Sequence, residues 1–179
     1  MLFDIDMQHH TEHPLVELAR QAILHYLTTG KHLESADELC VEWQRPGAAF
    51  VSLQRRGELR GCIGTCVATQ PSLAQEIIQN AVAAATADPR FPSVSLDDME
   101  EIDISVDVLA SPQKVESEAQ LDPKRYGVIV RAGERGGVLL PDIAQVTTAE
   151  SQLAIARRKA GIRPDEPVEI YRFEVTRYH

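Results

Sequence analysis

The chain has 179 residues, of which 44% are hydrophobic, enough for a single domain with a sizeable core. Its formal net charge is −9, from 27 acidic and 18 basic residues, so we expect no direct binding to nucleic acid or to an anionic membrane. No apolar run approaches the ~18 residues of a membrane span, and acidic residues stand where a signal peptide is basic, which predicts a globular, cytoplasmic protein.

The first predicted element is an amphipathic helix from Pro14 to Thr28, with Gly30 suited to its exit. Three histidines precede it, namely His9, His10 and His13. They have the spacing of metal ligands only if a helix runs through them, whereas Pro14 indicates that the helix begins just after them. We therefore expect a mobile N-terminus and no metal site.

The next predicted pair of strands contains the most unusual motif of the chain. The apolar, β-favouring residues 48–53 lead into a turn at residues 55–57, and residues 59–65 then pair back as a second strand. This heptad reads LRGCIGT, and packing alone does not readily account for it, since glycine inside a strand usually marks a bulge or a close backbone approach. Its distinctive residues are Arg60, Gly61, Cys62, Gly64 and Thr65.

The rest of the chain alternates between helical and strand patterns. Residues 72–87 predict a helix stopped by Pro89, residues 102–109 predict a half-buried strand, and residues 126–140 predict a hairpin with a glycine-rich tip. Thr147 and Glu150 suggest a capping box before a helix over residues 149–160, and residues 168–175 form the final predicted strand. Hairpins and separated helices favour an α+β fold with a mainly antiparallel sheet flanked by helices.

The three cysteines are Cys40, Cys62 and Cys66, an odd number that indicates free thiols in a reducing compartment. On one strand, Cys62 and Cys66 would share a face but lie about 13 Å apart, beyond the ~7 Å Cα limit of a disulfide. A disulfide between them would require the strand to break at Gly64.

The heptad resembles the signature of the AMMECR1 family, and later landmarks of the chain follow the same order. These landmarks are residues 88–92 (DPRFP), 109–112 (LASP), 136–141 (GGVLLP) and 159–161 (KAG). The resemblance covers residues 46–179 and leaves 1–45 as a variable N-terminal part of a single domain, 1–179. It implies an α+β fold in two unequal lobes, with the signature near the cleft between them. It also implies Memo-like and radical-SAM proteins as partners, but no established biochemical activity. We expect no cofactor.

Arg60 and Arg90 are the candidate clamps for a small anionic ligand. The guanidinium of Arg60, N–H groups beside Gly61 and Gly64, and the Thr65 hydroxyl would form a pocket for phosphate or carboxylate, with Arg90 as a second clamp. The alternatives are structural. Arg60 would pair with Glu58 or another carboxylate, and Arg90 would form a salt bridge that caps the turn after the preceding helix.

Cys62 has two interpretations, a reactive thiol or a small buried hydrophobic residue. A nearby Arg60 would favour the thiolate, but no histidine is near in sequence to act as a base, although His25 or His32 could approach in the fold. Two function classes follow. One is a binding or accessory module, which we favour; the other is an enzyme with Cys62 as nucleophile or redox thiol and Arg60 orienting an anionic substrate.

Overall fold

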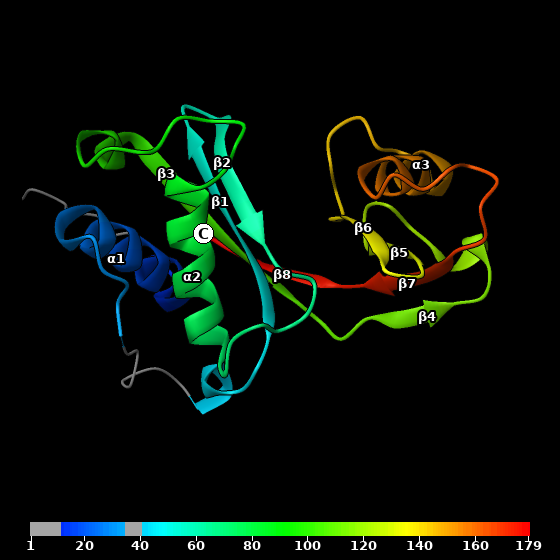
Figure 1. The fold of residues 1–179 in the computed structure, drawn as a ribbon, viewed down its shortest axis with the longest axis horizontal. Helices are drawn as coiled ribbons and strands as arrows, with labels where there is room; N and C mark the ends of the chain where they lie inside the picture. Colours follow the sequence, from blue (N-terminus) through cyan, green and yellow to red (C-terminus); the bar gives the residue numbers. More distant parts are fainter. Residues whose placement is uncertain (1–11, 35–40) are drawn as a thin grey trace, which may run out of the picture.

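The computed structural model describes residues 12–34 and 41–179, which form an α+β fold with two antiparallel four-stranded sheets, as the sequence predicts (Figure 1). No helix within these ranges is long and apolar enough to cross a membrane. The helices are α1 (Pro14–Thr29), α2 (Leu73–Thr86) and α3 (Ala149–Lys159), with short 3₁₀ turns at Val41–Gln44, Asp97–Glu101 and Glu118–Gln120. The strands are β1 (Ala48–Arg55), β2 (Glu58–Gly64), β3 (Ile102–Leu109), β4 (Gln113–Val115), β5 (Gly127–Ala132), β6 (Arg135–Leu139), β7 (Glu169–Phe173) and β8 (Val175–Tyr178).

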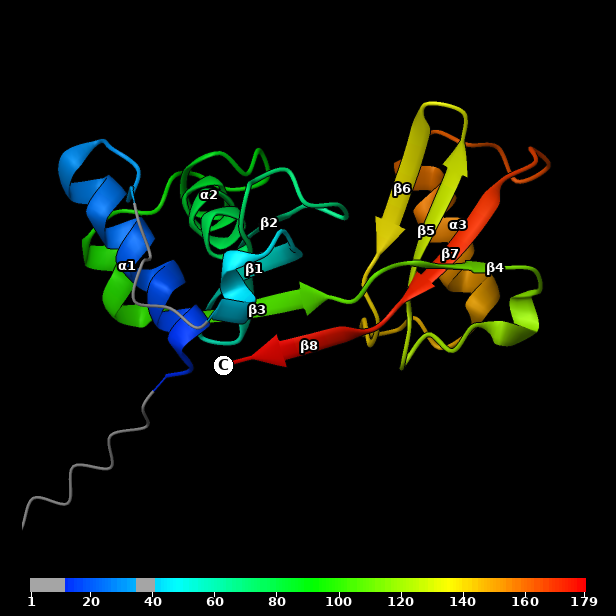
Figure 2. The same cartoon turned by 90° about the horizontal axis from the view of Figure 1, so that it is seen from below.

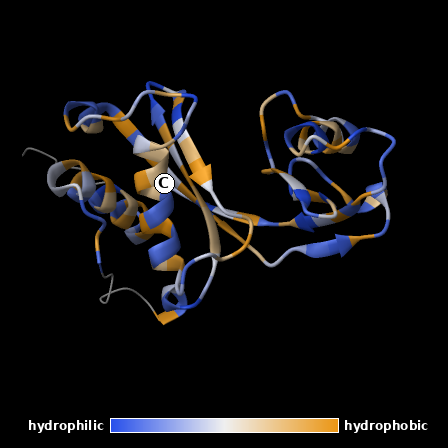
Figure 3. Cartoon of the chain, in the orientation of Figure 1, coloured by the Kyte–Doolittle hydropathy of each residue, from blue (hydrophilic) through white to orange (hydrophobic). Residues whose placement is uncertain are grey.

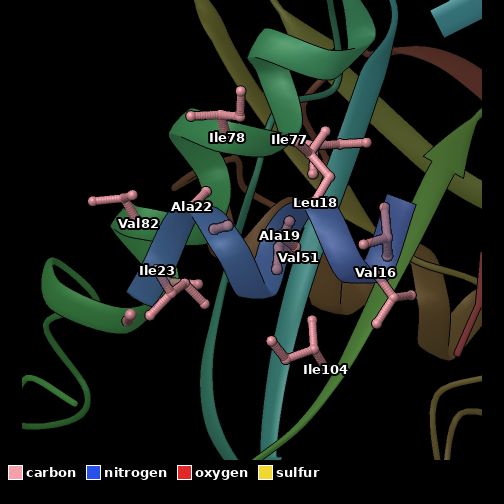
Figure 4. Packing of buried hydrophobic residues seen from close by; sticks show 14 of the residues in the cluster. Val16, Leu18, Ala19, Ala22, Ile23, Val51, Ile77, Ile78, Val82 and Ile104 are labelled. Carbon is pink, nitrogen blue, oxygen red and sulfur yellow. The ribbon is translucent and has the colours of Figure 1, made fainter. Parts of the chain in front are cut away.

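The first sheet has the strand order β2-β1-β3-β8, and α1 and α2 both cover one of its faces (Figures 1 and 2). Alternation along the strands sends Val51 and Val106 toward the helices, where both are fully buried. Figure 4 shows apolar side chains of the two helices meeting Val51 and Ile104 in this core. The strand residues that alternate with these buried ones, such as Ser52 of β1, point to the face that the helices leave open.

The second sheet has the order β4-β7-β5-β6 and carries a single helix, α3, on one face. Val128 and Val130 of β5 pack there against Leu153 and Ala156 of the helix, in a core much smaller than the first. The edge strand β4 is hydrophilic (Figure 3), and its Lys114 pairs with Glu169 of β7. A charged edge of this kind discourages pairing with another chain.

The two sheets meet through a third apolar cluster. Ala48 and Leu109 from the first sheet and Ile129 and Phe173 from the second are its buried members, and Cys66 packs against it. Gly127 lets the Phe173 ring lie over β5 within this cluster, because a Cβ at position 127 would lie 2.3 Å from the ring. The face of the second sheet opposite α3 is therefore used for packing.

The predicted final strand, residues 168–175, is in fact two strands. The chain pairs with β5 as far as Phe173, leaves the second sheet at Glu174 and then pairs with β3 of the first sheet as β8. The apolar pattern of the sequence does not reveal this change of sheet, because β7 and β8 are both strands and differ only in the strands with which they pair. Neither half alone predicts the crossing.

The structure confirms the predicted starts of α1 and α3 and corrects the capping residue of α3. Thr148, rather than Thr147, caps α3, because its hydroxyl accepts a hydrogen bond from the Ser151 N–H (3.1 Å). His13 caps α1 through Nδ1, which accepts from the Leu15 N–H, and its ring stacks on Tyr178 with centroids 4.0 Å apart. His9 and His10 lie outside the described residues, as does Cys40.

Candidate functional site

Strand β2, which carries the LRGCIGT motif, lies at the edge of the first sheet. Cys62 faces Ser52 of β1 directly, and the Ser52 hydroxyl donates to the Cys62 Sγ at 3.2 Å. The Cys62 N–H points away from β1, so this is a pair without mutual backbone hydrogen bonds, the kind in which cross-strand side chains come closest. Both residues are partly exposed on the face opposite the helices.

The two glycines of the motif lie against other parts of the protein. A Cβ on Gly61 would lie 2.2 Å from the Ala84 carbonyl oxygen of α2, and a Cβ on Gly64 would lie 2.2 Å from the Phe50 ring. Real Cβ atoms do not approach so closely, so only glycine lets β2 lie this near the helix and β1. The close backbone approach that the sequence predicts is therefore an approach to neighbouring elements.

The outer edge of β2 is covered at Cys62 by two side chains of the DPRFP segment. The Asp88 carboxylate accepts a hydrogen bond from the Cys62 N–H (2.9 Å), and Arg90 donates to the Cys62 carbonyl oxygen (3.1 Å). Asp88 is 4% exposed and binds the Arg90 guanidinium through both of its oxygens (2.9 and 2.7 Å). The Arg90 hydrogen bonds hold the pKa of the Asp88 carboxyl far below its usual range, despite burial.

Arg60 also holds the loop after α2. Its guanidinium donates to the carbonyl oxygens of Pro92 (2.7 Å) and Ser93 (3.2 Å), so in this structure it binds backbone rather than Glu58. The residue lines a surface concavity of about 520 Å³ with Leu59 and the β1–β2 turn. Arg60 and Cys62 thus both form hydrogen bonds with the loop of residues 88–93, which contains Arg90.

Thr65 is tied to a buried acid of α2. Its hydroxyl donates to Glu76, which is 1% exposed and also accepts from the backbone N–H groups of Thr69 (2.7 Å) and Gln70 (2.8 Å). Burial by itself raises the pKa of Glu76, but these hydrogen bonds outweigh it, and the net pKa lies below the ordinary value. Glu76 therefore fixes the loop that follows β2.

The thiols of Cys62 and Cys66 differ in environment. In the part of the chain that the structure describes, the hydrogen bonds of Cys62 lead to Ser52, Asp88 and Arg90, and none leads to a histidine. His25 belongs to α1 on the covered side of the sheet, and His32 packs on Tyr26. Cys66 lies at the apolar junction of the two sheets, where burial raises the pKa of its thiol. Both cysteines are free.

A second arginine anchored by an aspartate lies on the same open face and was missed by sequence reasoning. Asp107 of β3 is 1% exposed and binds Arg177 of β8 through both carboxylate oxygens (2.7 and 2.9 Å). Strict alternation in β3 already placed Asp107 on the open face, but its partner lies 70 residues away. Among the described residues, no group of three or more His, Cys, Asp or Glu side chains fits a metal ion.

Comparisons with known proteins agree on one family. The AMMECR1 family model matches residues 16–178. A protein from Thermotoga maritima is 52% identical over 170 residues, covering 93% of this chain and 98% of that protein. One from Clostridium acetobutylicum is 46% identical over 167 residues, which span 92% of this chain but 36% of the other. The crystal structure of the uncharacterized protein PH0010 from Pyrococcus horikoshii matches with a TM-score of 0.85 and 35% identity, covering 91% of this chain and 88% of that one.

Proposed function

Because this chain belongs to the AMMECR1 family, we propose that it is a binding or accessory component that holds a small anionic ligand beside the LRGCIGT motif. The site is the open face and outer edge of β2, where Arg60, Cys62 and Arg90 are joined by the 88–93 loop. Gly61, Gly64 and Thr65 shape it by fixing β2 and the loop that follows. The ligand would carry a carboxylate or phosphate group, which a guanidinium binds through paired hydrogen bonds.

The observation that carries this proposal is the setting of Arg90. Its guanidinium is oriented by the buried carboxylate of Asp88, beside the Cys62 carbonyl, yet 53% of its side chain is exposed. An arginine held in place and still open to solvent is pre-organised for an anion, since little conformational freedom remains to be lost on binding.

The binding role is favoured over nucleophilic catalysis by the partner of the thiol. The Cys62 sulfur is hydrogen-bonded to the Ser52 hydroxyl, and a hydroxyl is too weak a base to take the proton of a thiol. A nucleophilic cysteine generally works with a base such as histidine, and the hydrogen bonds of Cys62 in the described structure lead to none. Covalent modification of Cys62 by a bound metabolite would favour the enzyme alternative.

Association with other proteins is the second part of the proposal, with Memo-like and radical-SAM proteins as the expected partners. The Clostridium relative supports it, because the region similar to this chain is there about a third of a longer protein, beside further sequence. Affinity capture of the tagged full chain from its own cells, followed by mass spectrometry, is expected to enrich such a partner. Enrichment of unrelated proteins alone would contradict this part.

The ligand is tested by purifying the protein from cells and identifying co-purified metabolites by mass spectrometry. We expect an anionic metabolite with the native protein and its loss in Arg90→Ala and Arg60→Ala. Arg158→Ala is the matched control, because it removes an exposed arginine of α3 far from the motif. Circular dichroism verifies folding of each variant. A metabolite profile that is the same in all four proteins would refute an anion site at the motif.

A further inference from the structure

A second concavity lies on the outer side of the second sheet, against the helix α3. Its volume is about 670 Å³, larger than the concavity at Arg60 and within the range of small-molecule pockets. One face of α3 lines it, and the loop of residues 161–164 lines the other side. The opposite face of the second sheet packs at the junction, so this concavity lies away from the LRGCIGT motif (Figures 1 and 2).

The loop that forms one wall is fixed by two arginines. Arg157 of α3 donates to the carbonyl oxygens of Arg163 (3.0 Å) and Glu166 (2.8 Å). Arg135 of β6 donates to the Gly161 carbonyl oxygen (2.8 Å) and pairs with the Glu166 carboxylate. The concavity is therefore formed before a ligand arrives, and binding does not have to order this loop first.

The bottom of the concavity is apolar. Leu153 and Ile162 line it and belong to the small core of the second sheet, where each is 4% exposed. Ala154 and Pro164 also line it, and both are exposed to solvent. An apolar group bound here would cover these side chains, so the hydrophobic effect favours its binding.

Charge is distributed unevenly along the concavity. Glu150 lines it in the first turn of α3 and Arg158 in the last, and the rise from residue 150 to residue 158 is about 12 Å in an α-helix. Glu118 and Arg163 add one charge of each sign to the lining. In the part of the chain that the structure describes, the Arg158 side chain forms no hydrogen bond or ion pair. Its guanidinium is therefore available to an anion.

The helix dipole offers a partial explanation for this arginine. A cation in the last turn of a helix interacts favourably with the partial negative charge at that end. This accounts for the charge of Arg158 but not for the fixed, apolar concavity beside it.

We propose that this concavity binds a small amphipathic anion, whose apolar body lies on Leu153 and Ile162 and whose acidic group binds Arg158. The acidic group is a carboxylate, sulfonate or phosphate, which a guanidinium binds through paired hydrogen bonds. Glu150 repels an anion and so sets the direction in which the ligand lies. The site is separate from the motif and does not rest on the proposed function.

The metabolites that co-purify with the protein distinguish the two sites. A metabolite held at α3 is expected to remain in Arg60→Ala and Arg90→Ala and to be lost in Arg158→Ala. This pattern is the reverse of the one expected at the motif. The motif ligand is unaffected by Arg158→Ala, so each set of variants is the control for the other.

The probe for direct binding is anilinonaphthalene sulfonate, which joins aromatic rings to a sulfonate and fluoresces more strongly out of water. Titration of the folded protein is expected to give saturable binding of one probe per chain. The amide NMR signals of Ala154 and Gly161 are expected to shift with the same affinity, which locates the probe. Circular dichroism verifies folding of each variant, because partly unfolded proteins also bind this probe.

Two substitutions change the lining without touching the core. Ala154→Glu is expected to weaken binding at least about tenfold, because the new side chain fills part of the concavity and repels the sulfonate. Ala144→Glu is the matched control, since Ala144 is exposed in the loop before α3 and does not line the concavity. Arg158→Gln is expected to weaken binding roughly threefold or more, and Arg158→Lys less, because lysine keeps the charge but loses the fork.

The outcomes separate this site from the motif. Equal affinity in native protein, Ala154→Glu and Ala144→Glu, or no saturable binding at all, would overturn the site at α3 and leave the proposed function untouched. Affinity that is lost in Arg90→Gln but kept in Ala154→Glu would place the probe at the motif and likewise overturn the site at α3. If Ala154→Glu does not fold, Ala154→Gln decides, because it adds bulk without charge, and native affinity in that variant contradicts the proposal.

Discussion

The two sheets repeat one arrangement, a β-hairpin followed by a helix that crosses its second strand. In the first, Gly61 of β2 lies under the Ala84 carbonyl of α2; in the second, Gly137 of β6 lies under the Ala156 carbonyl of α3, where a Cβ would be 2.0 Å from the oxygen. Both strands are at a sheet edge. The glycine is therefore a requirement of the architecture in both places.

The residue after each glycine shows where the two arrangements differ. Cys62 faces Ser52 in the first sheet, and Val138 faces Ile129 at the matching position of the second. The apolar pair packs into the junction between the sheets, whereas the polar pair lies on the open face. Since the same backbone accommodates valine and isoleucine, the thiol and hydroxyl are not needed to build the hairpin. The comparison thus singles out Cys62 of the motif and its cross-strand partner Ser52.

The largest predicted effect tests the shared arrangement. Gly61→Ala and Gly137→Ala are each expected to lower the free energy of unfolding by about 2 to 3 kcal/mol, because the new Cβ collides with a backbone carbonyl that has little room to move. Gly133→Ala is the control. It has open space and a φ of 59°, so only backbone strain of about 1 kcal/mol is expected. Urea unfolding measures the stability of all three variants. A loss of stability at only one of the two strand glycines would contradict the arrangement shared by the two sheets.

The second prediction concerns the edges of the two hairpins. Arg90 donates a hydrogen bond to the Cys62 carbonyl oxygen, and Lys159 donates one to the Val138 carbonyl oxygen (3.0 Å). At the first edge, the buried Asp88 carboxylate also accepts a hydrogen bond from the Cys62 N–H. We expect Asp88→Asn to lower the free energy of unfolding by about 1.5 to 2 kcal/mol at pH 7, as for the loss of hydrogen bonds to a charged group.

The loss of stability caused by Asp88→Asn is expected to depend on pH. The pKa of Asp88 is lowered by folding, so its stabilisation is complete above the unfolded pKa, near about 3.9, and is lost as pH falls below it. The gap between native protein and Asp88→Asn, measured by urea unfolding from pH 7 to pH 2.5, is thus expected to narrow below about pH 4. A gap that stays constant with pH would contradict the charged state of Asp88 as its source.

The third prediction compares the thiol on the open face with the thiol at the junction. Burial at the apolar junction raises the pKa of the Cys66 thiol, whereas Cys62 lies partly exposed on the open face of the first sheet. We expect iodoacetamide to modify Cys62 at least about tenfold faster than Cys66 at pH 7.5, because the thiolate is the reacting form. Peptide mapping over time measures both rates. Equal rates in the folded protein would favour a buried, structural Cys62.

The sequence predicted the elements well because periodicity and local stop signals are local properties. It also flagged Gly61 and Gly64 as close approaches, but their partners, Ala84 and Phe50, depend on the tertiary fold. For the same reason, the carbonyl partners of Arg60 and the ion pair between Asp107 and Arg177 were not predictable. Arg90 was the exception, because its partner Asp88 is two residues away and the salt bridge after the helix was one of the two alternatives.

The smallest predicted effect on stability is that of a double substitution that makes the first hairpin resemble the second at one cross-strand pair. The double substitution Ser52→Val and Cys62→Val replaces the polar cross-strand pair by an apolar one of the kind seen at Ile129 and Val138. Both positions are partly exposed and β-branched residues suit a strand, so we expect the free energy of unfolding to change by less than about 1 kcal/mol. The anionic metabolite found with the native protein is expected to be lost. A variant that unfolds at much lower urea would show that the pair is structural, whereas a stable variant that keeps the metabolite would show that the ligand site does not include Cys62.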